Sequence, residues 1–167
     1  MRRTVSTVAL GVVAAVVIGV IATNCGSDTT APKNKTYVAN LNPAAESTAV
    51  TTTGTGTATF VDLGSEIDWT LDLTNMTGVI LSHIHLGDAH AIGPDNAGPV
   101  IINLFIPNGA SGLLNGRVSH GSITSANNPT ISLDSLRVLF NNGHAYANVH
   151  TTAHPPGEIR DQIHPVP

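Results

Sequence analysis

Three histidines have the spacing that a metal site on a β-sheet would need: His83 and His85, separated by one residue, and His150 further along the chain. Residues two apart on a strand project from the same face, so the first two imidazoles would lie side by side. If the strand of His150 is a neighbour, all three would converge. Three imidazoles form a competent ligand set for copper or zinc. The preferred interpretation is nevertheless structural, with each histidine bonded to a nearby loop, because buried polar groups need such partners.

The other five histidines have weaker claims to such a site. Two of them flank the last predicted strand and would either extend the site or be solvated. His144 shares the predicted strand face of His150, His90 falls in a predicted exposed loop, and His120 has no partner in the sequence. These five are His90, His120, His144, His154 and His164.

Alternation of apolar and polar residues dominates the chain from Tyr37 onward and predicts β-strands. The clearest strands cover residues 57–61, 67–73, 79–85, 99–106, 117–123, 145–151 and 158–164. We also predict a strand in the Thr-rich run 48–57, with an irregularity at its glycines. One helix is predicted over residues 133–141, because its apolar residues have helical spacing and Asn142-Gly143 can cap its end. These elements predict an antiparallel, Greek-key-like β-sandwich of the immunoglobulin or superoxide-dismutase type with one short helix.

The final predicted strand carries three further charged residues. Glu158 and Arg160 share a face of the final strand, where they could act as a general acid and an electrostatic clamp. Such a pair more often forms an ion pair or fastens a loop. Asp161 lies on the opposite, apolar face, so it must be at a sheet edge, be paired, or lie near the histidines as a further ligand.

Two ordered blocks of sequence resemble one family. The first is Ser-His-Ile-His-Leu-Gly at 82–87, followed by Gly-Pro at 93–94 and Gly-Pro-Val at 98–100. The second is Ala-Tyr-Ala-Asn-Val-His-Thr at 145–151, followed by Pro-Pro-Gly-Glu-Ile-Arg-Asp-Gln-Ile at 155–163. Together they resemble the CHRD (chordin) domain, and specifically a bacterial lipoprotein-type member. The resemblance implies a structural signature made of Asn148, Gly157, Glu158 and Arg160. Asp161 departs from the family pattern, which usually has glycine at this position.

The N-terminal segment has the pattern of an export signal. Arg2 and Arg3 precede an uncharged apolar run from Val8 to Ala22, which closes on Cys25, the only cysteine. This arrangement resembles a bacterial lipoprotein signal, in which the cysteine carries the lipid. Asn24 departs from the small residue usual before that cysteine, so an uncleaved membrane anchor and plain secretion stay open. The predicted organisation is a signal over 1–25, a flexible tether over 26–35 and a CHRD domain over 36–167.

Composition limits the functions that this chain can have. Removing the signal takes two of the seven basic residues away and leaves all eleven acidic ones, which argues against nucleic acid as a partner. We find no catalytic motif and expect no enzyme activity. The resemblance implies an exported binding or structural module at the cell surface, attached to the membrane at its N-terminus and with an extracellular protein as a possible ligand. The alternative is a copper- or zinc-binding protein of the cell envelope that uses the three histidines.

Overall fold

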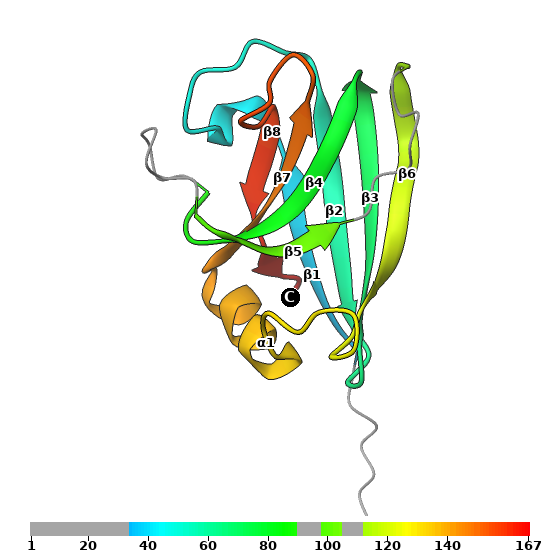
Figure 1. The fold of residues 1–167 in the computed structure, drawn as a ribbon, viewed down its shortest axis with the longest axis vertical. Helices are drawn as coiled ribbons and strands as arrows, with labels where there is room; N and C mark the ends of the chain where they lie inside the picture. Colours follow the sequence, from blue (N-terminus) through cyan, green and yellow to red (C-terminus); the bar gives the residue numbers. More distant parts are fainter. Residues whose placement is uncertain (1–33, 90–97, 105–111) are drawn as a thin grey trace, which may run out of the picture. The chain divides into compact units, whose positions relative to one another are not determined.

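The computed structural model describes residues 34–89, 98–104 and 112–167. These residues form two antiparallel sheets packed as a β-sandwich, with one short α-helix (Figure 1). The predicted all-β class is therefore confirmed. The five-stranded sheet has the order β6 (Leu114–Ile123), β3 (Ile67–Met76), β2 (Thr55–Asp62), β1 (Lys35–Leu41) and β9 (His164–Pro165). The four-stranded sheet has the order β5 (Val100–Leu104), β4 (Val79–Leu86), β7 (Ala145–Thr151) and β8 (Ile159–Gln162).

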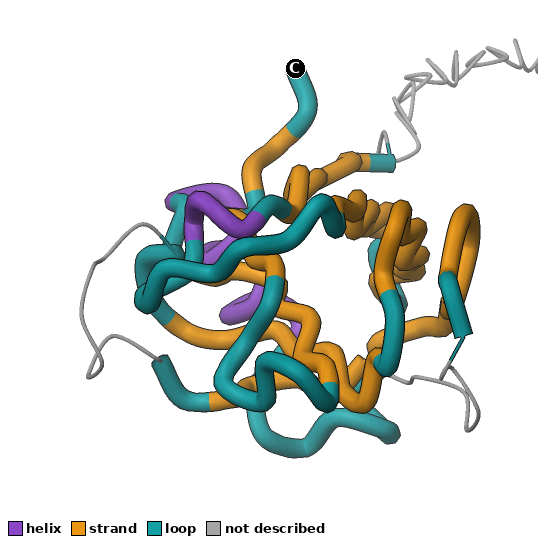
Figure 2. Tube along the Cα trace, turned by 90° about the horizontal axis from the view of Figure 1, so that it is seen from above, coloured by secondary structure: helices purple, strands orange, loops and turns teal. Residues whose placement is uncertain are grey.

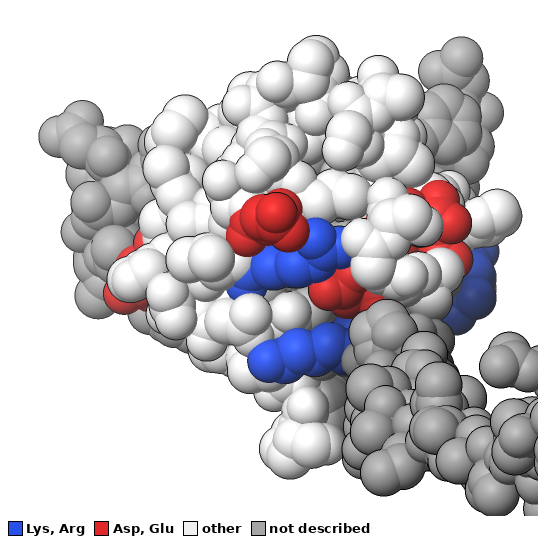
Figure 3. Space-filling model, turned by 90° about the horizontal axis from the view of Figure 1, so that it is seen from below, with Lys and Arg blue, Asp and Glu red and all other residues white. Residues whose placement is uncertain are grey.

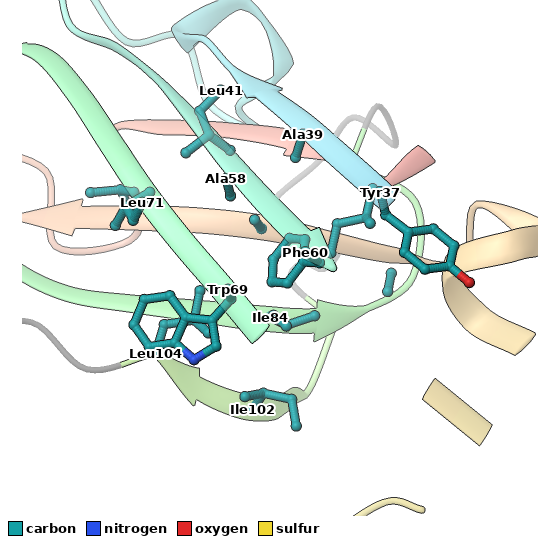
Figure 4. Packing of buried hydrophobic residues seen from close by; sticks show 14 of the residues in the cluster. Tyr37, Ala39, Leu41, Ala58, Phe60, Trp69, Leu71, Ile84, Ile102 and Leu104 are labelled. Carbon is teal, nitrogen blue, oxygen red and sulfur yellow. The ribbon is translucent and has the colours of Figure 1, made fainter. Parts of the chain in front are cut away.

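Alternating side chains of the two sheets form the apolar core. In β3, burial alternates along the strand, so that Ile67, Trp69, Leu71 and Leu73 face inward while the residues between them do not. Phe60 from β2 and Ile84 from β4 are fully buried in the same cluster (Figure 4). Figure 2 looks down on these layers from above and shows the strands surrounding this interior. The period-two pattern therefore predicted the inward faces correctly.

Helix α1 (Leu133–Asn142) closes one end of the sandwich. Ser132 caps its start, because its hydroxyl oxygen accepts a 3.1 Å hydrogen bond from the Ser135 amide. Gly143 ends it in the left-handed conformation, with φ of 63°. Phe140 anchors the helix in the core, with its ring centroid 5.2 Å from that of Phe60. The predicted helix thus forms, one residue longer than expected.

An ion-pair cluster attaches the exposed side of this helix to β2. Arg137 donates to Asp62 at 2.7 Å and 2.9 Å, and it also donates to Asp134 within the helix. Figure 3 shows acidic and basic side chains lying side by side on the face seen from below. The Arg137 hydrogen bond is the largest influence on the carboxyl group of Asp62 and lowers its pKa. The paired charges fasten the helix and leave no broad patch of one sign on this face of the described residues.

Two strand predictions were wrong in position. The run 48–57 is not one strand, because β2 begins only at Thr55. The chain from the 3₁₀ turn η1 (Pro43–Ala45) to Gly54 instead crosses to the second sheet, where Thr52 donates to Glu158 at 2.7 Å. The predicted strand 158–164 is two strands, because β8 pairs in one sheet and β9 in the other. Buried Ile163 lies at the change of sheet.

The N-terminal predictions fall largely outside the described residues. The signal over 1–25 and all but the last two residues of the tether over 26–35 lie there. Within the described residues, no helix is long and apolar enough to cross a membrane.

Candidate metal centre

The outer face of β7, in the four-stranded sheet, is a buried polar layer. Every residue of β7 is buried, on the polar face as well as on the face toward the core. The antiparallel register pairs His83 with Asn148 and His85 with Tyr146, so these side chains share that outer face. His150 lies on the same face of β7, two residues beyond Asn148. The two histidine-bearing strands are therefore neighbours, which is the condition that convergence of the three imidazoles required.

Three loops cover this polar layer and bond directly to its side chains. The Arg160 guanidinium donates to the carbonyl of Ala45, in the turn that follows β1. Gln162 joins the loop after β4, accepting from the Ala89 amide and donating to the carbonyl of Gly87. Pro155, in the turn between β7 and β8, accepts from the ring of His150. The polar face is buried because loops, rather than a third sheet, lie over it.

The three predicted histidines form a compact cluster on this face. One ring nitrogen of each lies within 4.8 Å of the others, so all three fit within about 2.8 Å of a common centre. The closest pair is His83 Nδ1 and His150 Nε2, at 3.1 Å. Two imidazoles bound to one tetrahedral zinc ion have nitrogens roughly 3.3 Å apart, given bonds of about 2.0–2.1 Å. Small side-chain movements would bring the three nitrogens to bonding distance of one ion.

Backbone carbonyls fix the ring tautomers of two of these histidines. His85 Nδ1 donates to the carbonyl of Gly98 at 2.8 Å, and His150 Nδ1 donates to that of Pro155 at 2.9 Å. A carbonyl oxygen only accepts, so each Nδ1 carries the proton and each Nε2 keeps its lone pair. His85 Nε2 is buried and has no hydrogen-bond partner among the described residues. Carbonyl acceptors of this kind commonly orient metal-binding histidines.

Burial keeps the three imidazoles uncharged. It is the main cause that lowers the pKa of each of them. For His83, where the charges of His150 and His85 act in the same direction, the pKa falls to about 4. The hydrogen bonds to Gly98 and Pro155 partly oppose the shift at the other two rings. At neutral pH the cluster therefore offers lone pairs rather than positive charges.

Sequence reasoning missed Tyr146 as a supporting residue. Its ring stacks on that of His85, with centroids 4.9 Å apart and planes inclined by 7°. Its hydroxyl oxygen accepts a 3.0 Å hydrogen bond from the amide of Gly98, whose carbonyl in turn accepts from His85. Tyr146 thus holds both the ring and the loop that orients it. The only sequence signal for this supporting role was the position of Tyr146 on the same face of its strand as His150.

Two residues of the predicted signature, Glu158 and Arg160, fasten loops to the sheet. Glu158 accepts hydrogen bonds from Thr52 at 2.7 Å and Thr151 at 2.5 Å. Arg160 is 1% exposed and lies with its guanidinium 5.2 Å from the Tyr146 ring centre. Glu158 and Arg160 are therefore joined to separate partners in the loops and strands around them.

A buried carboxyl group that the sequence did not reveal lies beside this signature. Glu46 Oε2 is 3.7 Å from Arg160 Nε, and burial raises the pKa of Glu46 to about 7 despite that positive charge. Its Oε1 and Asn148 Oδ1 are buried without partners among the described residues. Both oxygens face the Cα of Gly157, where an added Cβ would lie 2.8 Å and 2.9 Å from them.

Asp161 and the other described histidines do not join the cluster. Asp161 Oδ2 accepts a 2.9 Å hydrogen bond from the Asn40 amide of β1, so it lies at the sheet edge rather than near the imidazoles. Within the described residues, the group that could hold a metal ion contains His83, His85 and His150 alone. His154 is partly buried. Three other histidines are exposed, namely His120, His144 and His164. His90 lies outside the described residues.

Comparison with known protein families identifies the family of this domain. The sequence model of the CHRD domain matches residues 37–163. The chain belongs to the CHRD domain family. This match covers every strand except β9, apart from the first two residues of β1, and includes all three clustered histidines; it is consistent with a non-catalytic binding or structural module. Searches of curated proteins and of solved structures gave no match.

Proposed function

We propose that this CHRD domain is an exported, non-catalytic module that binds one copper or zinc ion through His83, His85 and His150. The observation that carries the proposal is the unpaired Nε2 of His85, buried beside the two other imidazoles. A purely structural role would leave each ring nitrogen with a partner of its own. A cation at the centre of the cluster would supply the missing partner.

The chemistry of the ligand set favours copper or zinc over harder ions. Imidazole nitrogens suit these metals, whereas calcium and magnesium prefer oxygen ligands. The carboxyl groups of Glu158 and Asp161 lie outside the cluster and already accept hydrogen bonds from other groups. Bound in this way, the ion would cross-link β4 to β7 and act as a Lewis acid at any open position.

The N-terminal sequence supports export and a membrane attachment. The apolar run that ends at Cys25 has the pattern of a lipoprotein signal, and the residues before β1 would serve as a tether. We propose that the domain is held at the cell envelope by lipid on Cys25. The acidic balance of the remaining chain makes nucleic acid an unfavourable partner.

A second candidate function is an interaction module that needs no metal. It is favoured by the hydrogen bonds of His85 and His150, each of which fastens one loop to the sheet. In that case the histidines would be scaffold, and the ligand would be an extracellular protein.

Calorimetric titration of the purified protein with Cu²⁺ and Zn²⁺ separates the two candidates. We expect one ion to bind with a dissociation constant of about a micromolar or tighter. The variant His83→Ala/His85→Ala should lose this binding while its circular dichroism stays that of a folded β-protein. The matched control His120→Ala/His164→Ala removes two exposed histidines and should bind as the natural protein does. Absence of binding in the natural protein would leave only the interaction module.

A further inference from the structure

The histidine cluster is closed on one side and accessible on another. His85 and His150 are 6% and 7% exposed, and the free nitrogen of His85 is out of contact with solvent. His83 is only partly buried. An ion at the centre would therefore meet solvent on the side of His83.

Leu81 marks this accessible side. It precedes His83 by two residues on the same face of β4 and lies opposite His150 in the register. It is 49% exposed. On β7, Asn148 lies opposite His83 and is 3% exposed, and on β5 the exposed Asn103 lies opposite His83 on the other side. Access to the cluster is thus bordered by an apolar side chain, Leu81, and an amide side chain, Asn103, neither of which carries a charge.

The charge of the cluster would be unbalanced once a divalent ion is bound. The three imidazoles are neutral and contribute no negative charge. Buried Arg160 adds a positive charge close enough to act on His85. Among the described carboxyl groups, Glu46 lies 3.7 Å from Arg160, Glu158 and Asp161 hold hydrogen bonds elsewhere, and none of the three belongs to the cluster. A buried excess of positive charge is costly, and a bound anion would offset it.

We propose that the ion held by His83, His85 and His150 keeps one coordination position for a small, weakly hydrated monovalent anion, which enters beside Leu81. This inference rests on the proposed metal binding. Metal sites with three protein ligands characteristically leave the fourth position to water or an exogenous ligand, whereas closed structural sites use four protein ligands. The site would then be a receptor for anions and a point of exchange for the ion rather than a sealed cross-link.

Cobalt(II) is a suitable probe because its visible absorption reports on its ligands. The purified protein is loaded with Co²⁺ and then titrated with sodium azide at constant ionic strength. We expect a saturable change in the cobalt absorption bands. The variant Leu81→Asp should weaken azide binding about fivefold or more, because a carboxylate at the entrance repels the anion. The matched control Ile80→Asp, at the adjacent 42% exposed position, should change azide binding much less.

The outcomes distinguish the inference from the function on which it rests. Failure of Co²⁺, Cu²⁺ and Zn²⁺ to bind would overturn the proposed function. Tight Co²⁺ binding with a spectrum that azide does not change would overturn only the open position, and would indicate a fourth ligand from the protein. Equal weakening by the two aspartate variants would overturn entry beside Leu81.

Discussion

His83 Nδ1 lies 3.1 Å from His150 Nε2, and a single proton joins them. His150 Nδ1 carries a proton and donates it in a hydrogen bond to the carbonyl of Pro155. His150 Nε2 must therefore accept the hydrogen bond that His83 Nδ1 donates. A metal ion at this position would take the place of that proton, and His83 would then carry its proton on its other nitrogen. Metal-free and metal-bound states therefore compete for the same lone pair.

Tyr146→Phe tests whether Tyr146 supports metal binding by holding the loop that orients the His85 ring. The phenylalanine ring can still stack on His85, but the Gly98 amide loses its acceptor. We expect metal affinity to fall about tenfold and the free energy of unfolding to fall by about 1 kcal/mol. Titration calorimetry and urea unfolding measure the two effects. Tyr37→Phe, a buried tyrosine on the other sheet, should leave metal affinity unchanged; an equal loss in both variants would contradict the orienting role.

Glu46→Gln should reveal a stability contribution that depends on pH. Burial raises the pKa of folded Glu46 to about 7, against 4.5 for an ordinary glutamic acid. Between these values the folded state holds a proton that the unfolded state has released, so stability from this group falls as pH rises. The difference in unfolding free energy, natural protein minus variant, should decrease by about 1–3 kcal/mol across this window.

Chemical denaturation at a series of pH values measures this difference, in which the titration of the histidines cancels. Arg160 and Tyr146 are the charged or titratable groups coupled to Glu46 and are unchanged in the variant. The protonated carboxyl group also offers a donor in a place where Asn148 Oδ1 lacks one. A difference that stays constant from pH 4.5 to 7 would show that Glu46 is ionised throughout.

Gly157→Ala should destabilise the fold through a steric clash. An added Cβ would lie 2.7 Å from Asn148 Nδ2 and 2.8 Å from Glu46 Oε1, and the residue has φ of 142°. We expect a loss of about 2–4 kcal/mol, measured by urea unfolding. Gly116→Ala is the control, because Gly116 also has positive φ but nothing within 4 Å of the added Cβ. A similar loss in both variants would mean that backbone strain alone requires glycine.

Cys25→Ser tests the proposed attachment to the membrane. We expect the natural protein, expressed in a bacterial host that processes lipoproteins, to fractionate with membranes and to begin with a lipid-modified Cys25. The variant should lose the lipid, which intact-mass spectrometry of the purified protein reports directly. A natural protein whose N-terminus is unmodified, or still includes residues 1–24, would favour plain secretion or an uncleaved anchor, respectively.

The sequence by itself determined the sandwich, its helix and the shared face of the histidines. These features follow from local periodicity: alternation set the inward faces of β3 and β7, and Ser132 and Gly143 limit the helix. The placement of His83 and His85 on one face of their strand also followed from strand geometry alone. The run 48–57 failed as a strand because its Thr-rich composition cannot distinguish a sheet residue from a loop residue bonded to a distant carboxylate.

Only the tertiary structure decided what lies over the polar face of β7. Glu46 is more than a hundred residues away from Arg160 in the chain, and no pattern in the sequence joins them. The carbonyls of Gly98 and Pro155 fix the histidine tautomers, yet backbone carbonyls occur along the whole chain, so the roles of these two depend on where the loops fold. Local spacing places side chains on a face, whereas the burial and hydrogen bonds that give them their chemistry arise from segments brought together by folding.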